Sequence, residues 1–125
     1  MALDSVYLAA RFERRDELNG YRAELEAAGL EVTSRWLTDP TPELTDEAWR
    51  QLAAKDVEDI RRAGGLVLFA ESGGSGGGGR QVEFGVALGF GKRLIVVGEP
   101  ENLFHRLAEV EVVPTWDAAV TAIVA

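Results

Sequence analysis

The stretch Leu66-Val-Leu-Phe-Ala70 is a near-continuous apolar run, and a glycine-rich segment and then Gln81-Val-Glu-Phe-Gly-Val-Ala-Leu-Gly-Phe90 follow it. An apolar run of this length predicts a buried strand of a parallel sheet that is covered on both faces. The segment after the glycines has the length and apolar content of a short helix. Strand, loop and helix in this order predict one repeating unit of an α/β domain.

The same alternation continues on both sides of this unit. We expect further strands at residues 5–10, 30–36, 93–97 and 110–113, and further helices at residues 14–28, 45–63, 102–107 and 115–124. Thr45 is the predicted N-cap of the second of these helices. Strands and helices that alternate in this way predict a five-stranded parallel sheet with right-handed crossovers. We therefore expect a single doubly wound, flavodoxin- or Rossmann-like α/β domain over residues 1–125.

Composition narrows the range of functions. The 125 residues include 13 Lys and Arg and 21 Asp and Glu, which gives a formal net charge of −8. Such an acidic chain is not expected to bind a nucleic acid polymer, which requires a basic face. The absence of cysteine and the presence of one histidine exclude thiolate metal sites, a cysteine nucleophile and sites built from several histidines. The sequence shows no signal peptide and no membrane span, so we expect a cytoplasmic protein that acts on a small molecule.

The glycines are concentrated in one place. Eight of the 14 fall between Gly64 and Gly79, in a segment whose flanking pieces are each too small to fold alone. We therefore expect a loop inside one domain rather than a linker. The loop formally matches the dinucleotide fingerprint, but it follows the third strand instead of the first, and we expect no cofactor and no metal. Its amides can bind an anion at a helix N-terminus, and a loop without a ligand is the alternative.

In a sheet of this kind ligands bind beyond the carboxyl ends of the strands, which directs attention to residues 10–15, 36–39 and 71–83. Glu83 is expected in the first turn of the helix after the glycines. The helix N-terminus would keep its carboxylate ionised, as a nucleophile requires, although a simple helix-dipole role is the alternative. A cluster of arginines, Arg11, Arg14 and Arg15, suits one anionic group or a set of surface salt bridges.

Several other residues have two interpretations each. Asp56 and Asp59 flank the core face of their helix, where a solvated position is the common outcome. Trp36 can stack on a planar ligand or pack at the rim of the sheet. His105 is expected at a helix surface or partly packed. Trp49 and Trp116 are expected in the core or at an interface.

Together these segments resemble the nucleoside 2-deoxyribosyltransferase-like superfamily, which includes deoxyribosyltransferases, deoxynucleoside 5′-monophosphate N-hydrolases and cytidylate N-glycosidases. The resemblance is carried by Val6-Tyr-Leu-Ala-Ala-Arg11, by residues 56–69 and 91–97, and above all by Gly79-Arg-Gln-Val-Glu-Phe-Gly-Val-Ala-Leu88. Two departures stand out. Ala10-Arg-Phe12 replaces the small glycine-serine turn of some members, and residues 122–125 offer no clear counterpart to the transferases' terminal carboxylate.

The resemblance implies a function and a set of site residues. It implies hydrolysis of the N-glycosidic bond of a nucleoside or deoxynucleoside 5′-monophosphate, with Glu83 as the nucleophile, Asp56 assisting departure of the base and Tyr7 orienting Glu83. The phosphate loop that it implies, with Ser72 or Ser75 facing the phosphate, joins the arginines and Trp36 that the residues themselves suggest. The expected substrate-binding set is Arg11, Arg14, Trp36, Ser72, Ser75, Gly77, Gly79 and Arg80. Transfer of deoxyribose between bases and nucleotide binding without turnover are the alternatives. The resemblance also implies a homodimer.

Overall fold

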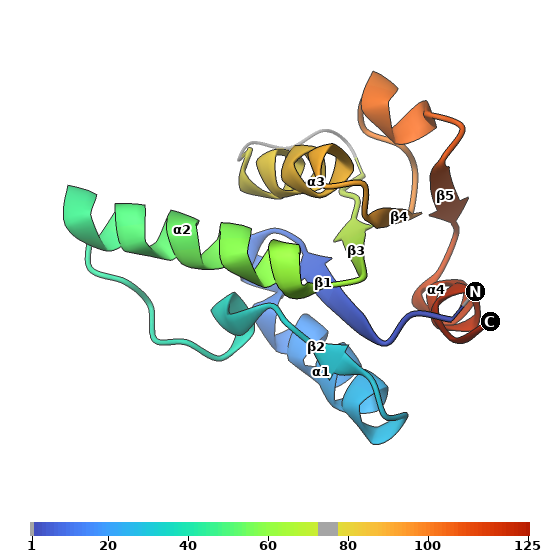
Figure 1. The fold of residues 1–125 in the computed structure, drawn as a ribbon, viewed down its shortest axis with the longest axis horizontal. Helices are drawn as coiled ribbons and strands as arrows, with labels where there is room; N and C mark the ends of the chain where they lie inside the picture. The colour runs from blue at the N-terminus through green and yellow to red at the C-terminus, as the bar shows by residue number, and fades with distance from the viewer. Residues whose placement is uncertain (1, 73–77) are drawn as a thin grey trace.

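The computed structural model describes residues 2–72 and 78–125. Its centre is a parallel sheet of five strands in the order β2-β1-β3-β4-β5 (Figure 1). The strands are β1 (Ser5–Ala9), β2 (Glu31–Val32), β3 (Gly65–Phe69), β4 (Arg93–Val97) and β5 (Val110–Val113). The order reverses beside β1, so the predicted doubly wound α/β fold is confirmed.

Helices cover both faces of the sheet. They are α1 (Arg15–Ala27), α2 (Asp46–Arg62), α3 (Gly79–Gly89) and α4 (Trp116–Val124), with short 3-10 helices η1 (Phe12–Arg14), η2 (Arg35–Leu37) and η3 (Leu103–Arg106). The helices α1 and α4 pack with one face, and α2 and α3 pack with the other. The N-terminal half of α2 extends beyond the sheet (Figure 1).

Alternation along the central strands separates two cores. Val6 and Leu8 of β1 face α1 and α4, whereas Tyr7 and Ala9 face α2 and α3. Every residue of β3 is buried, because both of its faces are covered. Burial of one such aliphatic side chain stabilises the fold by roughly 1.5–3 kcal/mol. The near-continuous apolar run in the sequence therefore indicates that this strand lies in the centre of the sheet.

The predicted strand over residues 30–36 is wrong in length. β2 ends at Val32, and the chain then leaves the sheet because buried polar groups bind it elsewhere. The hydroxyl of Thr33 donates to the carbonyl of Asp59 at 2.8 Å, and the backbone N–H of Arg35 donates to the Asp59 carboxylate at 3.0 Å. The resulting turn, η2, brings Trp36 to the carboxyl edge of the sheet.

Other local predictions have mixed outcomes. The Thr45 hydroxyl caps α2 by accepting from the N–H of Ala48 at 3.1 Å, as predicted. His105 is fully buried, which corrects the expected surface position. Trp116 belongs to the core and stacks on Tyr21 with ring centroids 4.4 Å apart. In the described ranges, 2–72 and 78–125, we find no helix with the length and apolarity to cross a bilayer.

Candidate active site

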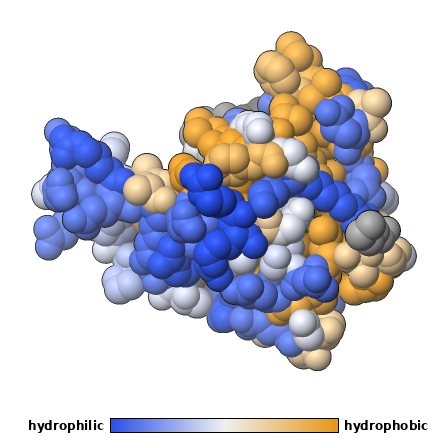
Figure 2. Space-filling view, viewed as in Figure 1, coloured by the Kyte–Doolittle hydropathy of each residue, from blue (hydrophilic) through white to orange (hydrophobic). Residues whose placement is uncertain are grey.

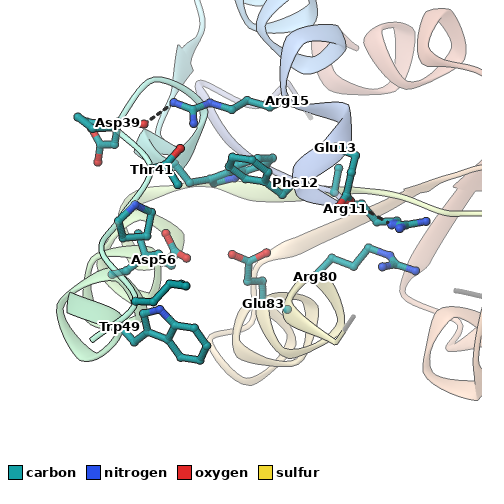
Figure 3. Close-up of a pocket in the computed structure, with 17 residues that line it drawn as sticks. Arg11, Phe12, Glu13, Arg15, Asp39, Thr41, Trp49, Asp56, Arg80 and Glu83 are labelled. Atoms are coloured by element: carbon teal, nitrogen blue, oxygen red, sulfur yellow. Dashed lines mark hydrogen bonds and ion pairs between the residues drawn. The ribbon is translucent and has the colours of Figure 1, made fainter. Parts of the chain in front are cut away.

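A cavity of about 620 Å³ lies at the carboxyl edge of the sheet, where the segments after β1 and β2 meet α2 and the start of α3. These segments include parts of the three stretches at which the sequence predicts a site. Parallel strands bring them together because all the carboxyl ends lie at one edge. Figure 3 shows the side chains that line the cavity.

A pair of carboxyl groups occupies the centre of the cavity. Glu83 projects from α3 and Asp56 from α2, and the two face each other (Figure 3). Tyr7, which is fully buried on β1, donates a hydrogen bond from its hydroxyl to Oε2 of Glu83. The structure therefore brings together Glu83, Asp56 and Tyr7, the three residues of the predicted catalytic set.

Burial controls the protonation of this pair. Burial raises the pKa of Glu83 to about 8, the hydrogen bond from Tyr7 opposes that shift, and the charge of Asp56 adds to it. Burial also raises the pKa of Asp56 to about 6, and the negative charge of Asp59 acts in the same direction. Since like charges this close resist joint ionisation, the pair holds about one proton near neutral pH.

This result corrects one expectation. Helix α3 begins at Gly79, two residues before the predicted start at Gln81, so Glu83 lies beyond its first turn. The free amides of a helix are confined to its first turn, and their effect on charge falls off quickly past it. Desolvation is the largest influence on Glu83, and the carboxyl group is therefore not held ionised by the helix as the sequence suggested.

The predicted phosphate-binding residues are divided by the structure. Arg11, Gly79 and Arg80 line the cavity, and in Figure 3 the two arginines lie on the side of Glu83 away from Asp56. Arg11 forms a 3.3 Å ion pair with the exposed Glu13. Arg80 is buried, and its guanidinium is 2.6 Å from Glu101. Each of these arginines is therefore ion-paired with a glutamate, and Glu13 lines the cavity as well.

Arg14 and Ser72 do not line the cavity. The Arg14 guanidinium pairs with Glu17 at 2.8 Å and Glu71 at 3.1 Å, and it lies over the ring of Phe69. Ser72 is exposed in a turn after β3. Ser75 and Gly77, the other two residues of the predicted set, lie outside the described residues.

Trp36 lines the cavity, and a hydrogen bond to β1 fixes the orientation of its ring. Its indole N–H donates to the carbonyl of Leu8 at 2.9 Å, which ties η2 to β1. Asp59 holds the same turn in place. Its fully buried carboxylate accepts from the guanidinium of Arg35 at 2.7 Å. Asp59 is thus a buried anchor of the site rather than a solvated acid.

The buried His105 also stabilises the site from behind. The N–H of Glu101 donates to Nδ1 of His105 at 3.1 Å, so the proton of the neutral ring lies on Nε2, 2.9 Å from Oε1 of Gln81. The amide of Gln81 donates to Glu101 at 3.0 Å, and Glu101 holds Arg80. The histidine therefore fixes the first turn of α3 and is not available as a general base.

Sequence reasoning missed one wall of the cavity. This wall consists of Phe12, Pro40, Pro42, Leu44, Trp49 and Leu52. A signal was present in part, because Trp49, Leu52 and Asp56 are spaced by three and four residues and so share one face of α2. Nothing in the sequence tells that this face meets a cavity, since the opposite wall comes from residues remote in the chain.

Proteins of known structure resemble this chain in three dimensions. The cytidylate enzyme named CMP N-glycosidase BcmB, from Clostridium botulinum, superposes with a TM-score of 0.63 at 19% identity, over 95% of this chain and 97% of that one. A 2-deoxyribosyltransferase from Bacillus psychrosaccharolyticus superposes with a TM-score of 0.76 at 22% identity, over 92% and 89% of the two chains. The chain shares the fold of these two proteins.

The resemblance predicted from the sequence is confirmed at the level of the fold. No protein-family model matches the chain, and neither does any curated protein sequence. The similarity to these enzymes is therefore carried by the three-dimensional arrangement. The roles of the individual residues must be argued from the site itself.

Proposed function

We propose that this protein is an enzyme that hydrolyses the N-glycosidic bond of a nucleoside or deoxynucleoside 5′-monophosphate and releases the free base. One observation carries the proposal, namely the order of groups along the cavity: Arg11 and Arg80, then Glu83, then Asp56 (Figure 3). A nucleotide presents phosphate, sugar and base in the same order. The names of two solved structures that share this fold, an N-glycosidase and a deoxyribosyltransferase, agree with it.

The carboxyl pair suits a two-step reaction of the retaining type. In the first step the Glu83 carboxylate attacks the anomeric carbon, the C–N bond breaks, and its electron pair leaves with the base. Asp56 supplies the proton that the departing base requires. Because the pKa of Glu83, about 8, lies above that of Asp56, about 6, the shared proton rests on Glu83 in the free site, and the reactive form is the one in which it has moved to Asp56. The hydrogen bond from Tyr7 favours this form because it stabilises the ionised Glu83.

The second step restores the pair. Asp56, now a carboxylate, accepts a proton from water as the water oxygen attacks the anomeric carbon and breaks the ester to Glu83. Nucleotide and water are converted to free base and sugar phosphate, and the single shared proton returns to its starting place. The same intermediate would transfer the sugar if a second base replaced water, which makes a transferase the runner-up.

A nucleotide-binding module without turnover is less well supported by the site. Two partly buried carboxyl groups with raised pKa values cost stability, and Oδ1 of Asp56 is buried without a hydrogen-bond partner among the described residues. Binding of an anionic nucleotide gains nothing from acidic groups in the middle of the cavity. An acid and a nucleophile explain them.

The test is a panel of ribo- and deoxyribonucleoside 5′-monophosphates, scored for free base by chromatography. We expect release from at least one member, and a loss of at least about 1,000-fold in Glu83→Gln, because the amide cannot form the ester. Glu109→Gln, which removes an exposed carboxylate outside the cavity, is the matched control. A second free base in the same assay separates transfer from hydrolysis, and release at the wild-type rate by Glu83→Gln would refute the assignment.

A further inference from the structure

The cavity does not end at the carboxyl pair. Beyond Asp56 it continues along α2 past Leu52 to Trp49, so these three side chains form a stripe on one face of the helix. Asp56 and Trp49 are seven residues apart, or about 10 Å along the axis. A bare pyrimidine that accepts a proton from Asp56 is too short to cover this distance. The far part of the cavity therefore remains unused by the reaction described above.

This far part is apolar. We define the apolar extension as Phe12, Pro40, Pro42, Leu44, Trp49 and Leu52. Three of them are strongly exposed, with exposed fractions of 52% for Phe12, 86% for Leu44 and 58% for Trp49. The charged groups nearby have partners of their own, since the Asp39 carboxylate accepts from Lys55 and the guanidinium of Arg15 donates to the backbone carbonyls of Leu37 and Asp39. Large apolar side chains exposed beside a cavity indicate that a ligand covers them.

We propose that the apolar extension binds an apolar or aromatic substituent on the leaving base. The preferred substrates are then nucleoside 5′-monophosphates whose base carries such a substituent. This inference rests on the proposed function, because it takes Asp56 as the side from which the base departs. The order of groups becomes phosphate, sugar, base and substituent. Figure 3 shows Arg11 and Arg80, then Glu83, then Asp56, and Trp49 lies toward the start of α2 from Asp56.

A second copy of the chain is the competing occupant of this surface. The features around Trp49 favour the ligand. On its outer side Trp49 is flanked by Asp46 and Arg50, and the side of α2 seen in Figure 2 is largely hydrophilic. A stable interface between copies requires a broad apolar area, whereas the two large apolar residues of this half of α2, Trp49 and Leu52, both line the cavity.

The experiment compares each parent nucleotide with a substituted partner. The probes are AMP with N6-benzyl-AMP, and CMP with N4-benzyl-CMP, in ribo and deoxyribo forms. For the wild type we expect kcat/KM for base release to be at least about tenfold higher for the substituted member of at least one pair. Trp49→Ala and Leu44→Ala should lower that ratio toward one. Phe104→Ala removes an aromatic side chain of similar exposure, 54%, outside the cavity, and should leave the ratio unchanged.

Two further measurements keep the outcomes separate. If no member of the nucleotide panel or of these pairs releases base, the proposed function fails. The extension is then tested alone by calorimetry on Glu83→Gln, where N6-benzyl-AMP should bind at least about tenfold more tightly than AMP. Adding Trp49→Ala should remove that preference. Equal rates and equal affinities for both members of each pair would overturn the inference. A dimer that dissociates in Trp49→Ala during sedimentation, without any substituent preference in the wild type, would assign the surface to a second copy.

Discussion

The two faces of the sheet differ in the side chains that they bury: one buries an aromatic cluster, and the other buries a pair of carboxyl groups. On the side of α1 and α4, the rings of Tyr21, Phe69 and Trp116 form a cluster in which Tyr21 stacks on the other two, with centroid distances of 5.5 and 4.4 Å. The indole N–H of Trp116 donates to Glu24 at 3.0 Å. On the side of α2 and α3, the buried Tyr7 points at a carboxyl pair whose pKa values are raised. On the first face the buried indole N–H has a hydrogen-bond partner. On the second face two carboxyl groups are partly buried, which makes their ionised forms unfavourable. We therefore expect the α1 and α4 side to contribute most to the stability of the fold, and the α2 and α3 side to carry the reaction.

The largest effect on stability is expected when a side chain is removed from the aromatic cluster on the side of α1 and α4. Trp116→Ala removes a nearly buried ring, 8% exposed, from the aromatic stack. Large aromatic truncations in a core cost about 3–5 kcal/mol, and urea denaturation should show a loss of this size. The rate of base release per folded molecule should stay close to wild type. A variant with full stability would show that this face does not carry the fold.

The chemical face should respond in the opposite direction. Because burial raises the pKa of Glu83 to about 8, its contribution to stability is complete below the ordinary pKa of a glutamate and is lost as the pH rises toward 8. Glu83→Gln removes that dependence. We expect it to be more stable than the wild type by at least about 1 kcal/mol at pH 9, and by less at pH 5, in thermal unfolding followed by circular dichroism.

Glu109→Gln, with its exposed side chain, is the reference for this measurement, and its stability difference from the wild type should not grow with pH in the same way. If Glu83→Gln is less stable than the wild type at pH 9, burial of the ionised Glu83 carboxylate does not destabilise the fold. The contrast between the two faces would then be wrong.

The smallest effect concerns the pH dependence of the reaction. The pair holds one proton between about pH 6 and pH 8, so kcat/KM should follow a bell with limits near those values. Tyr7→Phe removes a hydrogen bond that lowers the pKa of Glu83, so the limit near pH 8 should move to higher pH, and the rate near pH 7 should fall about tenfold because less Glu83 is ionised. Tyr21→Phe, which removes a hydroxyl from the other face, should leave the profile in place. Equal profiles for both variants would argue against a role of Tyr7 in positioning and ionising Glu83.

Much of the fold follows from local patterns in the chain. The apolar runs at residues 66–70 and 93–97 mark strands buried on both faces, and Thr45 marks the start of α2 where the structure has it. β2 is the exception. Its predicted length fails because Thr33 and Arg35 bind Asp59, which lies on a different element and leaves no trace in the local sequence.

The sequence by itself determined the alternation of strands and helices, the parallel sheet and the segments that meet at its carboxyl edge, because periodicity and chain length suffice for these features. It also singled out Glu83 by its position after the glycine-rich loop, and it gave Asp56 and Tyr7 their roles through the family resemblance. Only the tertiary structure decided the protonation of the carboxyl pair, the orientation of Arg14 away from the cavity and the apolar wall around Trp49. The physical reason is that desolvation, ion pairing and cavity shape depend on groups from several elements, whose distances are set by packing rather than by spacing along the chain.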